Sequence, residues 1–307
     1  DAVSIASILE KNGDGSPNFD VRRITSDSKE VTSELIHSAL AELFTGDAET
    51  ALFYFAGHGL ISQPANAGYI VSQDGRKGAF GVSLSEILEM ANKAYPRIQS
   101  TVIILDSCNS GYAGEVAGLN NERISAIGTG VTILTACHRK GTADEVDSGG
   151  LFTTLLLDGL SGSSADICGR ITPASVYSHI DQTLGSWEQR PIYKANVQSF
   201  ITLRTVTPKI SLDILRRLPT YFKNPTDYFP LDPSFEPDRE NIPESLRHIP
   251  VDEDKIRIFK ELQLCNRHGL IIPMEAEHMY YAAINSKSCK LTALGAHYRK
   301  LAEMSRI

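Results

Sequence analysis

The chain has 307 residues, 42% of them hydrophobic and 22% charged, and carries a net charge of −7. This length suits one domain of about 200 residues with a smaller second one, or two ordinary domains. An acidic chain lacks the basic surface of a broad nucleic-acid interface, and no apolar run of about 18 residues could span a membrane. The first residues do not form a signal peptide, so the sequence predicts a cytoplasmic protein.

Apolar patterns predict alternating helices and strands over the first 204 residues. Helical spacing and capping residues define the predicted helices, at residues 2–12, 35–43, 83–94, 150–160 and 172–184. Short β-branched and aromatic runs define the predicted strands, at residues 21–24, 52–56, 68–71, 101–105, 131–135 and 199–203. Continuous apolar strands that alternate with helices indicate a mainly parallel sheet covered on both faces, which is an α/β fold.

Proline changes the pattern after residue 204. Seven prolines between residues 219 and 250 predict a linker or irregular cover, which we place at residues 205–252. Helical spacing returns in the last segment, with a short apolar strand at 270–272 and a helix in LTALGAHYRKLAE. The L-T-x-x-G phrase resembles the tail of winged-helix modules, so we expect a small helical, winged-helix-like domain at residues 253–307.

Basic residues are only moderately clustered in this C-terminal segment, at Lys287, Lys290, Arg299 and Lys300. A DNA-binding module normally presents a basic patch or stripe to the phosphate backbone. We therefore expect residues 253–307 to bind a regulatory protein partner rather than nucleic acid.

Two segments carry side chains suited to catalysis. The strand at 52–56 runs into GHG, which contains His58, and the strand at 101–105 runs into DSCNSG, which contains Cys108. Open α/β sheets place active sites where strands end, so the two side chains emerge at one edge if the strands are neighbours. A thiol at neutral pH needs a base, and imidazole can take its proton and later protonate a leaving amine. The sequence predicts a dyad of nucleophile Cys108 and general base His58.

Backbone groups complete the predicted site. The glycines beside the dyad leave N–H groups free to face a developing oxyanion, and we assign that hole to the N–H groups of Gly59 and Cys108. A third residue that would complete a catalytic triad is not evident from the sequence, and a backbone carbonyl could orient the imidazole. The five cysteines are widely spaced without a CxxC pair, so no metal site is predicted and a reducing compartment is indicated.

These motifs resemble the caspase-like cysteine peptidases (clan CD, peptidase C14), above all the metacaspase and bacterial caspase-homologue branch. His58 precedes Cys108 by 50 residues, and a caspase His lies about 50 residues upstream of its Cys. Downstream, VTILTAC, GGLFTTLLLDGL and QRPIY are similar to later parts of that fold. The resemblance covers about residues 1–204. It implies an endopeptidase acting on protein substrates in a regulated stress or defence response, such as antiviral defence or programmed cell death.

The resemblance also implies a substrate preference. Animal caspases carry Gln-Ala-Cys-Arg-Gly at the nucleophile, with an Arg that serves acidic P1 residues. Here that Arg is absent and Asp106 stands two residues before Cys108, as in metacaspases, where this acid lines the S1 pocket. Charge complementarity then favours cleavage after Arg or Lys rather than after Asp. Asp106 could instead cap the loop.

The resemblance also bears on maturation by self-cleavage and on activation by calcium. The loop at 112–130 contains Arg123, a candidate self-cleavage site, and an uncut surface loop is the equal alternative. The dyad requires no cofactor. Metacaspases often bind calcium through acidic loops, and Glu115, Asp74 and Glu89 are candidates for such activation. Their spacing matches no dense oxygen-ligand loop, which favours solvated acids.

Family members normally open with a hydrophobic strand, whereas this sequence opens at a helix, so an upstream segment is absent or the sheet is completed differently. Two other functions compete with an active endopeptidase. A catalytically silent caspase-like scaffold would bind partners through its C-terminal module, but the intact pair of His58 and Cys108 argues against it. A peptidase of the CHAT or separase type would share the His-Gly and Cys motifs, but the D-S-C-x-S-G motif favours a caspase-like peptidase.

Overall fold

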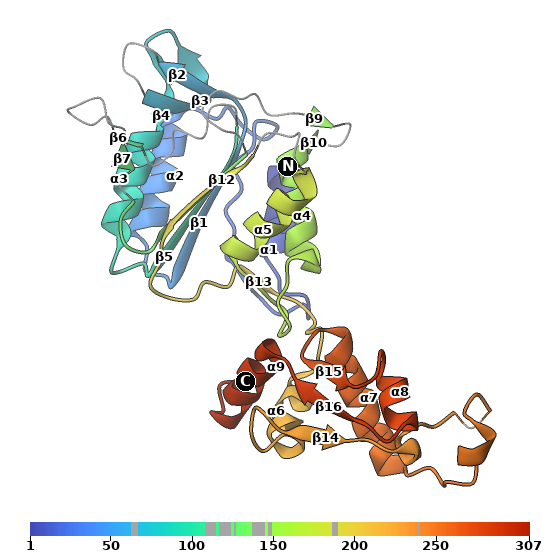
Figure 1. Cartoon of the computed structure of the whole chain (residues 1–307). Helices are drawn as coiled ribbons and strands as arrows, with labels where there is room; N and C mark the ends of the chain where they lie inside the picture. Colours follow the sequence, from blue (N-terminus) through green and yellow to red (C-terminus); the bar gives the residue numbers. More distant parts are fainter. Residues whose placement is uncertain are drawn as a thin grey trace. The chain divides into compact units, whose positions relative to one another are not determined.

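The structure is a computed structural model of the chain, which forms two compact units, Asp1–Thr207 and Pro208–Ile307. Figure 1 shows the helices and strands of both units. The structure describes residues 1–62, 67–107, 115–116, 124–125, 127–136, 145–146, 149–185, 190–238 and 240–307.

A four-stranded sheet forms the centre of the first unit. Its strands, in spatial order, are β1 (Thr50–Ala56), β5 (Ser100–Asp106), β8 (Val131–Thr135) and β12 (Ile192–Asn196). The first three are parallel, and β12 is antiparallel to β8. Every residue of β5 and β8 is buried, as expected for parallel strands covered on both faces. The predicted mainly parallel sheet is confirmed.

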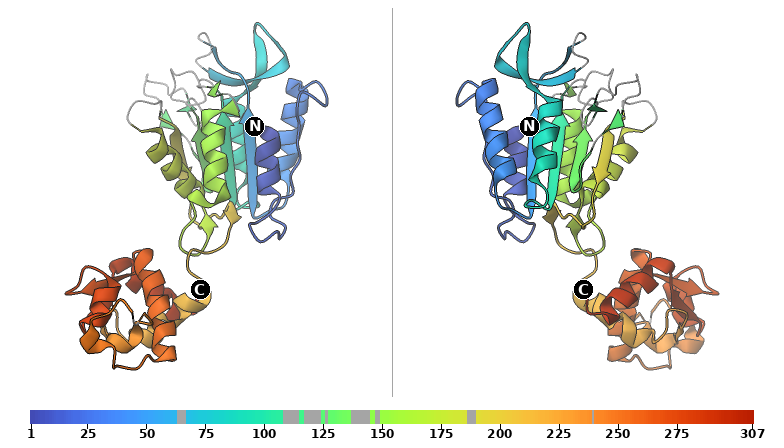
Figure 2. Two further views of the ribbon diagram at one scale, coloured as in Figure 1. Left: turned by 90° about the vertical axis from the view of Figure 1, so that its right-hand side faces the viewer. Right: turned by 90° about the vertical axis from the view of Figure 1, so that its left-hand side faces the viewer.

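Helices cover both faces of this sheet (Figure 1). On one face lie α2 (Ser33–Thr45) and α3 (Leu84–Ala94), and on the other lie α1 (Ala2–Leu9), α4 (Leu151–Asp158) and α5 (Pro173–Leu184). Figure 2 shows the same layers from two further sides. The arrangement is the α/β architecture that the sequence predicts.

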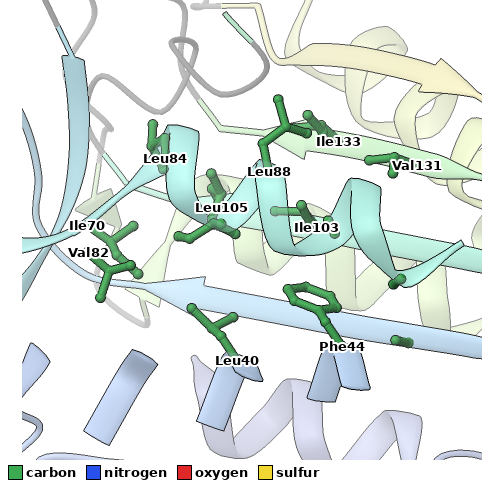
Figure 3. Packing of buried hydrophobic residues seen from close by; sticks show 14 of the residues in the cluster. Leu40, Phe44, Ile70, Val82, Leu84, Leu88, Ile103, Leu105, Val131 and Ile133 are labelled. Carbon is green, nitrogen blue, oxygen red and sulfur yellow. The ribbon is translucent and has the colours of Figure 1, made fainter. Parts of the chain in front are cut away.

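Each face of the sheet has its own hydrophobic core, because successive strand residues point to opposite sides. Ile103 and Leu105 of β5 pack with Leu40, Phe44 and other side chains of α2 and α3 (Figure 3). Val102 and Ile104, the residues between them, pack instead with α1, α4 and α5. The apolar run of β5 therefore has no polar position that could face water.

Helix starts agree with the capping signals in the sequence. The Ser83 hydroxyl accepts a hydrogen bond of 3.1 Å from the N–H of Glu86 at the start of α3. The Thr172 hydroxyl accepts a hydrogen bond from the N–H of Ser175, and the N–H of Thr172 donates in return to the Ser175 hydroxyl, with proline at the first helical position of α5. These caps satisfy N–H groups that have no partner within the helix.

Smaller elements surround the sheet. A three-stranded antiparallel sheet, β2 (Gly59–Ser62), β3 (Ala67–Arg76) and β4 (Ala79–Ser83), follows β1 directly. A π-helical turn, Gly159–Ser163, continues α4. The short strand pairs are β6 (Glu115–Val116) with β7 (Ile124–Ser125), β9 (Glu145–Val146) with β10 (Gly149–Gly150), and β11 (Arg170–Ile171) with β13 (Arg204–Thr205).

Two predicted strands of the first unit are wrong. Residues 21–24 form no strand, because the two successive arginines, which are exposed, break the apolar alternation of a half-buried strand. Residues 199–203 form no strand either. Ile201 and Leu203 are buried, but they pack against the helical layer, and the last strand of the sheet is β12, about seven residues earlier.

The second unit is built around a three-stranded antiparallel sheet in the order β14-β16-β15. Its strands are β14 (Tyr228–Pro230), β15 (Ile271–Met274) and β16 (Ser288–Leu291), and its α-helices are α6 (Leu212–Tyr221), α7 (Glu253–Arg267), α8 (Met279–Ile284) and α9 (Ala293–Glu303). Two 3-10 turns, Pro233–Phe235 and Glu244–Leu246, follow β14. Aromatic rings form its core: Phe229 contacts Phe222 and Phe235, and Phe235 contacts Phe259, with ring centroids 6.0 to 6.1 Å apart.

The proline-rich segment differs from the expected linker or irregular cover at 205–252. It supplies α6 and β14 to the second unit, and α6 packs against α9. Leu215 and Leu218 of α6 are completely buried. A segment rich in proline thus contributes a helix and a strand to the core of the second unit. The winged-helix likeness of 253–307 stays a prediction, and the connection from β15 to β16 contains α8.

Gly295 marks a close contact in the second unit. A Cβ at this position of α9 would lie 2.0 Å from the carbonyl oxygen of Leu270 and 2.9 Å from its carbonyl carbon. We expect Gly295→Ala to destabilise this unit by about 3 kcal/mol, because neighbouring backbone cannot move cheaply. Hydrogen exchange of the α9 amides in the full chain measures the effect. Leu294→Ala, at an exposed position of the same helix, is the control, and equal protection in both variants would contradict the prediction.

Candidate active site

His58 stands where β1 leaves the central sheet. β1 ends at Ala56, and β2 begins at Gly59, so His58 lies between two strands of different sheets. Its carbonyl oxygen accepts a hydrogen bond of 2.9 Å from the N–H of Val71 on β3, and the Gly57 N–H donates to the Asp106 carbonyl at 3.1 Å. The backbone is thus held on both sides, while the residue itself is exposed.

The pairing of β1 with β5 bears directly on the predicted dyad. The two strands are parallel neighbours in unbroken register, from Thr50 opposite Ser100 to Ala56 opposite Asp106. The condition that the two catalytic segments leave the same edge of the sheet is therefore met. Cys108 itself lies outside the described residues, so its approach to His58 stays a prediction.

Asp106, the last residue of β5, is only 7% exposed. Its Oδ2 accepts a hydrogen bond of 2.5 Å from the hydroxyl of Thr153 on α4, and that hydroxyl lies 2.5 Å from the hydroxyl of Tyr54 on β1. Burial raises the pKa of the Asp106 carboxyl, and the hydrogen bonds from the side chain and backbone of Thr153 oppose that rise. The acid predicted to line the S1 pocket is therefore a buried, hydrogen-bonded group at the same edge as His58.

Asp106 also supplies a cap to α4. The N-cap residue of this helix, Gly150, has no side chain to offer, and Thr153 lies in the first turn. A carboxylate at a helix N-terminus satisfies unpaired N–H groups and interacts favourably with the helix dipole. The structure thus gives Asp106 a local capping role, as the sequence alternative allowed, but toward a helix rather than toward its own loop.

Sequence reasoning missed Tyr54 and Thr153. They come from elements about 100 residues apart, and no local pattern joins them to Asp106. The one available signal is the hydroxyl of Tyr54 inside the apolar run LFYFA, since a buried tyrosine hydroxyl usually needs a hydrogen-bond partner.

Gly59, the predicted oxyanion-hole residue, pairs with Ile70 on β3. The preceding pair, His58 with Val71, carries a hydrogen bond. Bonded and non-bonded pairs alternate along an antiparallel ladder, so the N–H of Gly59 points away from β3. The other predicted oxyanion donor, the N–H of Cys108, lies outside the described residues.

Two of the three calcium candidates, Asp74 and Glu89, have other partners in the structure. The Asp74 carboxylate accepts hydrogen bonds of 2.8 and 3.0 Å from the N–H and hydroxyl of Ser33, and Glu89 pairs with Lys93 at 2.5 Å. The side chain of Glu115, like Arg123, lies outside what is described. Within the described ranges, no group of three His, Cys, Asp or Glu residues could hold a metal ion.

Three of the four basic residues named in the C-terminal segment have partners in the structure. Arg299 is buried and donates to the carbonyl of Phe222 at 2.5 Å and to Glu303 at 3.0 Å. Lys287 pairs with Glu275 at 2.6 Å, and Lys290 lies 5.9 Å from the ring centroid of Tyr228. These cations are therefore poorly placed to form the basic patch that DNA binding requires. No helix in the described parts of the chain is long and apolar enough to cross a membrane.

Comparison with known proteins identifies the family. Residues 1–200 match the family model of the caspase domain, Peptidase C14. Because this match covers well over half of the 307 residues, the chain belongs to the caspase-domain family. Membership gives a caspase-like fold, cysteine peptidase activity at the level of the family, and protein substrates.

Two solved structures illustrate the similarity of the chain to known proteins. Protein GSU0716 from Geobacter sulfurreducens is 13% identical, with a TM-score of 0.48, over 67% of this chain and 87% of that one. Caspase-1 from Spodoptera frugiperda is 13% identical, with a TM-score of 0.43, over 66% of this chain and 80% of that one. No curated protein matches the chain.

Proposed function

We propose that the chain is a cysteine endopeptidase that hydrolyses proteins after Arg or Lys, with Cys108 as nucleophile and His58 as general base. The observation that carries the proposal is the register of β1 and β5, in which Ala56 lies opposite Asp106. His58 and Cys108 each follow this pair by two peptide units, which span at most about 7 Å between Cα atoms. A thiol and an imidazole that start so close to one pair can meet at the sheet edge.

The proposed reaction has two halves. His58 takes the thiol proton of Cys108, and the thiolate attacks the carbonyl carbon before the scissile bond to form a tetrahedral oxyanion. Collapse of this intermediate expels the amine, which receives the proton from His58, and leaves a thioester. Water, deprotonated by the same imidazole, then attacks the thioester and releases the carboxylic acid and the thiol.

Oxyanion stabilisation is proposed to come from the N–H groups of Gly59 and Cys108. The outward direction of the Gly59 N–H supports this role, because that group is not used by the ladder with β3. Gly59 is half-buried and directly follows the exposed His58, which supports a donor close to the proposed general base. Backbone donors fixed by strand pairing need no reorganisation during the reaction, which is what makes them effective.

Asp106 is proposed to accept the positive charge of the P1 side chain. Its place at the end of β5, two residues before Cys108, supports this role. A carboxylate has about four acceptor sites, so the bonds from Thr153 leave capacity for a substrate cation. In a buried site a charge-assisted bond of this kind is strong.

We expect Asp106→Asn to lower kcat/KM for substrates with Arg or Lys at P1 by about 100-fold, since losing one partner of a buried charge pair costs about 2–5 kcal/mol. Fluorogenic peptides with Arg, Lys or Asp at P1, with and without calcium, measure this. The folded-state pKa of Asp106 is raised, so its ionised form costs stability above that pKa and costs none below the unfolded value. The variant should therefore be at least as stable as the parent at pH 7.

Asp158→Asn, at the other end of α4, is the matched control and should keep the parental rate. Cleavage after Asp alone would remove the proposed role of Asp106. Failure of the full chain to cleave any of the peptides, with or without calcium, would favour a catalytically silent scaffold. Activity that depends on calcium would support a calcium-binding site that includes Glu115.

The proposed biological setting rests on the family likeness. We propose a regulated stress or defence response, such as antiviral defence or cell death, and maturation by self-cleavage after Arg123. Residues 253–307 are proposed to bind a regulatory protein. Exposed apolar side chains on this segment, among them Ile272, Tyr281 and Leu294, support a protein surface more than a nucleic-acid one.

A further inference from the structure

Three polar side chains from three elements meet near the end of β5. Tyr54 lies on β1, Asp106 ends β5, and Thr153 lies in the first turn of α4. The Thr153 hydroxyl oxygen is 2.5 Å from Asp106 Oδ2 and 2.5 Å from the Tyr54 hydroxyl. Asp106 and Thr153 are 7% and 1% exposed. With so little access to water, these groups must satisfy most of their donors and acceptors among themselves.

The direction of the hydrogen bonds follows from the protons available. Ionised Asp106 can only accept, so the single hydroxyl proton of Thr153 goes to Asp106 Oδ2. The Tyr54 hydroxyl must then donate to the Thr153 oxygen. Burial raises the pKa of Tyr54, so the phenol keeps the proton that it donates. The result is a directed chain from Tyr54 through Thr153 to Asp106.

The same contacts determine which oxygen of Asp106 is available. Oδ2 accepts from the Thr153 hydroxyl, and a Cβ built on Gly150 would lie 2.6 Å from Oδ2 but 3.5 Å from Oδ1. Oδ2 is therefore the oxygen turned toward α4, and Oδ1 is the one left to accept from another direction.

We propose that Thr153 and Tyr54 are positioning residues for P1 recognition, which hold Asp106 so that Oδ1 can accept the cation of Arg or Lys. This inference rests on the proposed function, because it requires Asp106 to line the S1 pocket. Thr153 acts on Asp106 directly, and Tyr54 acts only through Thr153. Without the Thr153 hydroxyl, the buried carboxylate loses a donor and can rotate away from its productive orientation.

The test compares Thr153→Val, which removes the hydroxyl at similar volume, with Thr153→Ser, which keeps it. The readout is selectivity, the ratio of kcat/KM for a P1-Arg peptide to that for its P1-Gln counterpart. We expect a fall of about tenfold for Thr153→Val and less than about twofold for Thr153→Ser, in line with one hydrogen bond to a charged group. A loss that affects both peptides equally would indicate a merely structural role and overturn the inference.

Tyr54→Phe gives an independent arm that also serves if Thr153→Val does not fold. We expect its selectivity to fall by about threefold, since only the second bond of the chain is lost. In the Thr153→Val background, the same substitution should have no further effect, because Tyr54 acts through the missing hydroxyl. A further threefold loss in the double variant would contradict that order.

Benzamidine, a small mimic of a P1 cation, separates this inference from the proposed function. Its binding is measured by calorimetry on the full chain carrying Cys108→Ala. We expect Thr153→Val to weaken binding about tenfold and Asp106→Asn to abolish it. A chain that binds this way but cleaves nothing upholds the inference and overturns the peptidase proposal. Cleavage after Arg with unchanged selectivity in Thr153→Val overturns the inference alone, and neither binding nor cleavage overturns both.

Discussion

Replacing Cys108 by Ala is expected to lower kcat/KM for a P1-Arg peptide by about 10⁴-fold or more, since removing a nucleophile eliminates the covalent route. An alanine methyl group cannot form the thioester, so only the oxyanion hole and substrate binding remain to assist water. The measurement is steady-state hydrolysis of the fluorogenic peptide at neutral pH, with protein concentration fixed by absorbance.

Cys168→Ala is the matched control for this loss. Cys168 is half-buried and lies in the turn before β11, so the substitution makes the same chemical change elsewhere in the unit. It should retain activity within about twofold, as expected for a site apart from the chemistry. Equal losses in both variants, or none in either, would remove Cys108 from the proposed role.

Replacing His58 by Ala is expected to lower kcat/KM at pH 7 by about 10³-fold, because general base and general acid assistance are both lost. A free thiol ionises near pH 8.5, so only a few per cent of it is thiolate at neutral pH. The thiolate fraction then rises about tenfold per pH unit up to that value. The rate of His58→Ala should therefore recover in part between pH 7 and 9, more than the rate of the parent does.

His37→Ala is the control for the imidazole. His37 lies on α2, with its Nε2 3.1 Å from Glu86 on the surface, and its loss should leave the pH profile unchanged. A profile of His58→Ala parallel to that of the parent would show that another group activates the thiol.

The buried strands could be predicted closely from sequence. β5 and β8 are continuous apolar runs, and burial on both faces is what such runs require. β12 could not be predicted in the same way, because it is an edge strand whose last two residues, Ala195 and Asn196, are exposed. Its partner is chosen by tertiary packing rather than by pattern.

The candidate site also contains residues that the sequence pattern indicates and residues that only tertiary packing brings together. His58 stands out because a histidine between glycines after an apolar strand has few structural uses. The contribution of Thr153 could not be predicted, because it depends on where α4 meets the end of β5, and that contact joins residues 47 positions apart. In the proline-rich segment a local pattern is misleading instead. Pro219 lies inside α6, although proline normally interrupts a helix.

The unbroken pairing of β1 with β5 has a consequence for how the chain can change. Ala56 and Asp106, which precede His58 and Cys108 by two positions each, are aligned by strand register, and β2, β3, β4 and α3 in the connection between the strands take no part in that pairing. Gly78, at the β3–β4 turn, has a φ of 92°, and a Cβ built on it would have no atom within 4 Å. Extra residues inserted there would lengthen the spacing of the two motifs while their strand ends stayed level. The interval of 50 residues is thus set by the length of this connection, and we expect the proposed dyad to form at other intervals as well.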